Sequence, residues 1–91
     1  MARIGIIGDF NPDYRSHHAT NAALRHAALH LGCTVEIAWV PTVSLVEPRA
    51  VEILASYDGL WASPGSPYRS MQGMFAGIRF ARTRNLPLVA T

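Results

Sequence analysis

Hydrophobic residues along this chain come in short blocks that alternate between a strand pattern and a helix pattern. Compact aliphatic and aromatic runs, typical of strands buried in a parallel sheet, occupy 3–8, 34–40, 58–62 and 86–91. Apolar residues recur at helical spacing over 16–31, from Pro48 to about Ser56, and over 70–85. The pattern therefore predicts the element order βαβαβαβ.

Helix boundaries and core faces follow from the same pattern. Gly32 stands just past the first helix, where a glycine can adopt the left-handed conformation that ends a helix. The apolar residues of that helix that recur at helical spacing are Ala19, Ala23, Leu24, Ala27, Ala28 and Leu31. In the second strand, alternation puts Val35, Ile37 and Trp39 on one face. The second helix is expected to direct toward the core Val51, Ile53 and Leu54. The third helix is expected to bury Met71, Met74, Phe75, Ile78 and Ala81.

Strands that alternate with crossover helices predict an α/β fold, a three-layer flavodoxin-like parallel sheet with helices on both faces. Ligands of such sheets bind beyond the carboxyl ends of the strands. Those ends lead into the loops Asp9–Tyr14, Pro41–Val46 and Ser63–Tyr68, and into whatever follows Thr91.

Composition suggests that this fold needs more polypeptide. The 91 residues are 49% hydrophobic and only 15% charged, which is more apolar than so short a chain comfortably buries. The last strand, at Leu86–Thr91, has the pattern of a buried strand, but residues 1–91 alone would leave its apolar surface uncovered. Residues 1–91 are therefore expected to form the N-terminal portion of a single domain, with the remaining C-terminal polypeptide of that domain as a partner. Association with further copies of the chain stays open.

Charge and cysteine content exclude several function classes. Eight arginines, six acidic residues and no lysine give a net charge of +2, so lysine Schiff-base chemistry and a lysine phosphate loop are excluded within these residues. The arginines are scattered, which argues against nucleic acid as a partner. No apolar run is long enough for a membrane span. The single cysteine, Cys33, fits a cytoplasmic protein and is interpreted as an inert core residue.

Other polar residues carry weaker signals. His26 and His30 lie four apart, but two ligands do not make a metal site, so an exposed helix face is the preferred interpretation and no metal or cofactor is expected. His17 and His18 could approach a ligand, although a polar helix start explains them. Asp9 follows the first strand as in a response regulator, whose acidic pocket also needs a lysine that this chain lacks.

Several separated motifs resemble one family. They are Ile4–Gly8, Pro12–Tyr14 with Ser16, Ala23–Ala27, Val51–Leu54, Tyr57–Leu60, Pro64–Ser66, Arg69–Met74, Ile78–Arg82 and Asn85–Pro87. In order and approximate spacing they are similar to the glutamine amidotransferase domain of the CTP synthase family, a class I amidotransferase. The resemblance spans nearly the whole chain.

The resemblance implies hydrolysis of glutamine to glutamate and ammonia by a Cys-His-Glu triad. The family's cysteine follows the strand that matches Leu86–Thr91, so the nucleophile is expected just after Thr91 and no catalytic residue within these 91. The implied oxyanion and substrate-binding residues are Gly65, Ser66, Pro67 and Tyr68.

This turn departs from the family, which has Pro-Gly-Gly followed by an aromatic residue in a loop one residue longer. Ser66 carries a β-carbon that restricts positive φ, and Pro67 has no N–H to donate. Two functions therefore stay open: part of a glutaminase with an altered oxyanion turn, or a catalytically inactive flavodoxin-like binding or regulatory module.

Overall fold

The protein is described here by a computed structural model that covers residues 1–46, 49–63 and 68–90. Along these residues the strands and helices alternate in the predicted order, with one 3₁₀ helix, η1, added. The elements are β1 (Ala2–Ile7), α1 (Arg15–Leu31), β2 (Val35–Val40), η1 (Thr42–Val46), α2 (Ala50–Ala55), β3 (Gly59–Ala62), α3 (Met71–Thr83) and β4 (Leu88–Ala90).

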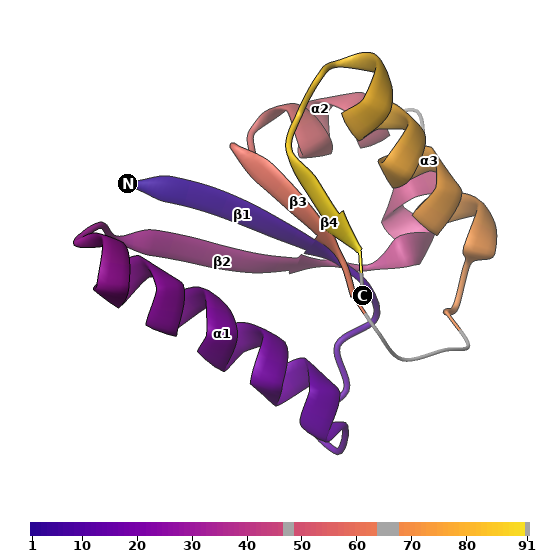
Figure 1. The fold of residues 1–91 in the computed structure, drawn as a ribbon. Coiled ribbons are helices and arrows are strands. Elements are labelled where there is room, and N and C mark those ends of the chain that lie inside the picture. Colours follow the sequence, from indigo (N-terminus) through magenta and orange to yellow (C-terminus); the bar gives the residue numbers. More distant parts are fainter. Residues whose placement is uncertain (47–48, 64–67, 91) are drawn as a thin grey trace.

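The strands form one parallel sheet in the order β2-β1-β3-β4. Helix α1 lies on one face of this sheet, whereas α2, α3 and η1 lie on the other (Figure 1). The chain moves from β1 outward to β2 and then back across to β3, so the two connections cover opposite faces. The predicted three-layer α/β fold is confirmed.

The main core lies between the sheet and the helices α2 and α3. Ile7 of β1 and Leu54 of α2 are almost completely buried there. The face toward α1 is packed differently: Ile6 is aligned with Trp39 and Trp61 on the neighbouring strands, and α1 buries only His17, Thr20 and Ala28. Of the apolar residues predicted at helical spacing on this helix, only Ala28 is buried, and Leu31 is 76% exposed.

The core face of α3 differs from the predicted stripe. Met74 and Ala81 are buried as expected, but Met71 and Phe75 are exposed, Phe75 by 56%. The buried positions are instead completed by Gly73 and Gly77. Two glycines on one face let α3 approach η1 and β1 closely, so the helix is rotated and its large apolar side chains at 71 and 75 turn outward.

Three other expectations need correction. The segment Pro41–Val46, predicted as a loop, contains η1. Helix α2 begins at Ala50 and leaves Val51 exposed; the predicted start at Pro48 lies outside the described residues. The last strand is shorter than predicted, and its Val89 is 54% exposed because β4 is an edge strand with β3 as its described neighbour. Thr91 also lies outside the described residues.

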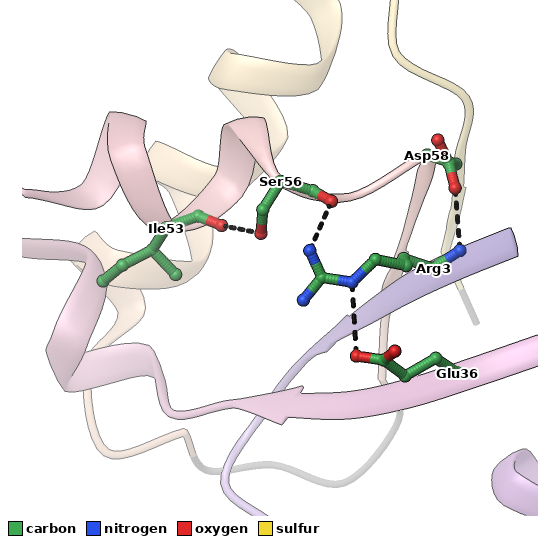
Figure 2. Close-up of polar contacts among 5 residues, drawn as sticks. All are labelled: Arg3, Glu36, Ile53, Ser56 and Asp58. Atoms are coloured by element: carbon green, nitrogen blue, oxygen red, sulfur yellow. Dashed lines mark hydrogen bonds and ion pairs between the residues drawn. The ribbon is translucent and has the colours of Figure 1, made fainter.

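The amino end of the sheet is held together by Arg3, as Figure 2 shows. Its guanidinium donates to Glu36 of β2 (Nε to Oε1, 3.2 Å) and to the Ser56 carbonyl (3.0 Å) after α2. Its backbone exchanges two hydrogen bonds with Asp58, one to the Asp58 carboxylate and one from the Asp58 N–H. These contacts fix the end of the sheet opposite the one where ligands bind in this class of fold.

Candidate functional site

The turn predicted from the sequence lies only in part within the described residues. Gly65, Ser66 and Pro67 lie outside the described residues. Tyr68 is half-buried against the core, and its hydroxyl donates a hydrogen bond to the carbonyl oxygen of Ser63, at the end of β3. Tyr68 therefore lies at the carboxyl edge of the sheet, and its hydroxyl is hydrogen-bonded to the backbone.

Asp9 joins the loops that follow three different strands. Its Oδ1 accepts a hydrogen bond from the Thr42 N–H (2.9 Å), and its Oδ2 accepts from the Thr42 hydroxyl (2.8 Å) and from the Arg69 N–H (2.8 Å). Asp9 follows β1, Thr42 follows β2, and Arg69 lies between β3 and α3. One carboxylate thus holds together the carboxyl ends of the three neighbouring strands β2, β1 and β3.

The same network continues into α3. The Thr42 hydroxyl oxygen accepts from the Ser70 N–H (2.9 Å), and the Ser70 Oγ caps α3 by accepting from the Gly73 N–H (3.0 Å). Thr42 itself is completely buried. The start of α3 is therefore fixed relative to the loops after β1 and β2.

These contacts also lower the pKa of the Asp9 carboxyl group. Partial burial raises its pKa, but the N–H groups of Arg69 and Thr42, the Thr42 hydroxyl and the positive charge of Arg69 outweigh this and bring it below the ordinary value of 3.8. Asp9 is therefore an anion at neutral pH, and its role is to hold the loops.

Ser63 lies at the same edge of the sheet, directly after β3 and beside the end of β1. Its N–H donates to the Ile7 carbonyl (3.1 Å), its side chain is fully buried, and its Oγ has no hydrogen-bond partner among the described residues. A Cβ added to Gly8 would lie 2.1 Å from this Oγ, so any other residue at position 8 would require the Ser63 hydroxyl to move.

Replacing Ser63 with alanine is expected to raise the free energy of unfolding by about 1 kcal/mol, because a buried hydroxyl without a partner costs desolvation energy. Urea denaturation would measure this. The matched control is Ser44→Ala, which removes a hydroxyl that donates to the Pro41 carbonyl (2.7 Å) and should lower stability. A Ser63→Ala protein less stable than the wild type would contradict the prediction.

An aromatic cluster borders the edge on the α1 side. His17 is 1% exposed, and its Nδ1 accepts a hydrogen bond from the Asn11 N–H (2.9 Å), which places the proton of the neutral ring on Nε2. Its ring lies 4.6 Å from that of Trp39 and 5.9 Å from that of Phe10, between centroids. The interpretation of His17 as part of a polar helix start is therefore wrong, whereas His18 is exposed as that interpretation requires.

The other sequence candidates lie elsewhere. His26 and His30 are on an exposed helix face, as preferred, and no group of three or more metal-ligating side chains occurs in the described ranges. Cys33 is exposed, so its interpretation as a core residue is wrong: it follows the left-handed Gly32 in a surface turn at the amino end of β2. No helix in the described part of the chain is long and apolar enough to cross a membrane.

Sequence reasoning missed the main members of this edge. The sequence indicates Asp9 only as the acid of a pocket that also needs a lysine, and it predicts no role for Thr42 or Ser63. A usable signal existed, because Asp9, Thr42 and Ser63 each stand one or two residues beyond a predicted strand, and those ends meet at one edge of a parallel sheet.

Comparisons with known proteins bear on this fold and edge. No protein-family model matches the chain. The CTP synthases of Acidobacterium capsulatum and Methanococcoides burtonii are each 31% identical to it, over 84 and 85 residues, and that of Staphylococcus carnosus is 29% identical over 84. Each alignment covers 92% of this chain, which spans only 15–16% of the length of these relatives.

A solved structure, the glutaminase domain of Trypanosoma brucei CTP synthase with bound acivicin, superposes on 99% of this chain and 36% of that one. The TM-score is 0.85 at 23% sequence identity. The chain is therefore similar in sequence to part of CTP synthase and has the fold of the matching part of a CTP synthase glutaminase domain.

Proposed function

We propose that residues 1–91 are the amino-terminal portion of a class I glutamine amidotransferase domain that hydrolyses glutamine to glutamate and ammonia. The observation that carries the proposal is the carboxyl edge, where Asp9 and Thr42 hold the loop after β3 at the start of α3. That loop contains the turn that the resemblance assigns to the oxyanion. The similarity to CTP synthase supports the same assignment.

In this proposal the turn acts through its backbone. Attack on the glutamine amide places negative charge on its oxygen, and N–H groups held in a fixed loop stabilise that charge without reorganising, by several kcal/mol. Gly65 and Ser66 can each donate an N–H, and Tyr68 would border the substrate. The Cys-His-Glu triad would come from polypeptide beyond Thr91, which is also the proposed partner of the exposed β4 edge.

One observation favours a second function. Pro67 has no N–H and Ser66 has a β-carbon, where the family has a second glycine and an aromatic residue. A binding or regulatory module without hydrolytic activity would tolerate these changes. Glutamine as ligand, homo-oligomerisation and a cytoplasmic location stay predictions under both functions.

A glutaminase assay on the full-length protein tests the proposal. We expect release of glutamate and ammonia from glutamine, and loss of both when the cysteine predicted just after Thr91 is replaced with alanine. Circular dichroism of this variant should match the wild type. A full-length protein that folds but releases no glutamate at saturating glutamine would contradict the proposal and favour the binding module.

A further inference from the structure

A small pocket opens at the carboxyl edge, on the side of the aromatic cluster. It has a volume of about 230 Å³ and is lined by Gly8, Asp9, Phe10, Trp39, Pro41 and Arg69. These residues come from the loop after β1, the end of β2 and the loop after β3. The volume lies just below the range typical of drug-sized ligands, so a fitting occupant is a small metabolite.

The aromatic wall of this pocket is fixed in place. The indole N–H of Trp39 donates to the Oδ1 of Asn21 on α1 (2.8 Å), and its ring lies 5.1 Å from the Phe10 ring, centroid to centroid, at an interplanar angle of 60°. Phe10 nevertheless remains 43% exposed. A rigid, half-open aromatic wall offers an apolar or cationic group a surface to pack on.

Charges of both signs border the same pocket. The guanidinium of Arg69 takes part in no ion pair or side-chain hydrogen bond among the described residues, although its backbone N–H is bound to Asp9. The Asp9 carboxylate accepts two hydrogen bonds at Oδ2 but only one at Oδ1, so Oδ1 keeps an acceptor position. A ligand with a carboxylate and an ammonium group satisfies both residues.

We propose that this pocket binds a free α-amino acid with an apolar or aromatic side chain. The guanidinium of Arg69 binds the α-carboxylate, for which its planar fork of donors is suited. The ammonium group lies near Asp9 Oδ1, and the side chain packs on Phe10 and Trp39. The inference goes beyond the proposed glutaminase function because binding here requires neither the nucleophile nor residues 64–67.

Isothermal titration calorimetry of the full-length protein with L-phenylalanine as the probe tests the proposal. We expect saturable binding with a dissociation constant below about 1 mM. N-acetyl-L-phenylalanine lacks the ammonium charge and L-phenylalaninamide lacks the carboxylate, so each should bind at least tenfold more weakly. Absence of saturable L-phenylalanine binding, or equal binding of either capped compound, would overturn the proposal.

The residue assignment is tested with Arg69→Gln and Phe10→Ala. Each should weaken L-phenylalanine binding at least tenfold, whereas Arg79→Gln, which changes an exposed arginine of α3, should leave it unchanged. Arg69→Gln keeps the backbone hydrogen bond to Asp9, and circular dichroism would verify that the variants fold. Unchanged binding in Arg69→Gln would sink the assignment. Glutaminase activity is measured separately, so either proposal can fail alone.

Discussion

Replacing Gly73 with alanine is expected to lower the free energy of unfolding by about 3 kcal/mol. A Cβ at this position would lie 1.8 Å from the carbonyl oxygen of Thr42 and 2.7 Å from its carbonyl carbon, so α3 must move away from η1. Overpacking of this kind commonly costs 1–3 kcal/mol, and here the obstacle is backbone that cannot change rotamer. The gain of about 1 kcal/mol from helix propensity does not offset it. Urea denaturation followed by circular dichroism measures the difference.

The matched control for Gly73→Ala is Gly77→Ala, one turn later on the same face of α3. Its added Cβ would lie 2.4 Å from Ile7 Cδ1, the far end of a side chain that can adjust. We expect less than half the loss seen for Gly73→Ala. If the two variants lost equal stability, the close approach of α3 to the Thr42 backbone would not be the cause.

Replacing Asp9 with asparagine is expected to lower the free energy of unfolding by about 2 kcal/mol at pH 7. Two N–H groups and a hydroxyl donate to this carboxylate, so an amide NH₂ in place of either oxygen faces a donor and leaves a hydrogen bond unmade. Asp13→Asn is the control, because Asp13 is exposed and its hydrogen bond to Asn11 comes from its backbone N–H. An equal loss in both variants would contradict the role of Asp9.

The effect of Asp9→Asn should depend on pH in a defined direction. Because the pKa of Asp9 in the folded protein is below its ordinary value of 3.8, its contribution to stability is present above pH 4 and disappears as the pH falls through the lowered pKa. The stability difference between wild type and variant is therefore expected to stay constant from pH 7 to about pH 4 and to narrow below it. A difference that stayed constant down to the lowest pH at which the protein folds would show that the charge of Asp9 contributes nothing.

The sequence predicted the elements better than their faces. The order of strands and helices was predictable because a buried parallel strand and an amphipathic helix leave different periods in a short window of residues. The buried face of each helix was harder to predict. Met71 and Phe75 have the spacing of a core stripe, yet Gly73 and Gly77 are buried on α3 instead of them. Helical spacing selects a set of aligned residues, but the partner surface decides which set is buried.

The candidate site was likewise predictable from the sequence only in part. The resemblance of the sequence to the amidotransferase domain of CTP synthase is supported by relatives and by the fold, whereas the substrate-binding role of Tyr68 remains a prediction. The implied residues Gly65, Ser66 and Pro67 lie outside the described part and remain predictions. Cys33 and His17 were assigned the wrong environments, because burial of a single residue depends on what the rest of the chain brings against it.

The amino-acid sequence by itself determined the βαβαβαβ order, the parallel three-layer class and the resemblance to one enzyme family. These properties depend on local periodicity and on motifs of a few residues. Only the tertiary structure brought Asp9 to Thr42, 33 residues away, and to Arg69, 60 residues away. The physical reason is that sheet order and helix packing set distances between residues far apart in sequence. The local pattern of residues predicts whether a segment forms a helix or a strand, but it does not predict which loops contact one another.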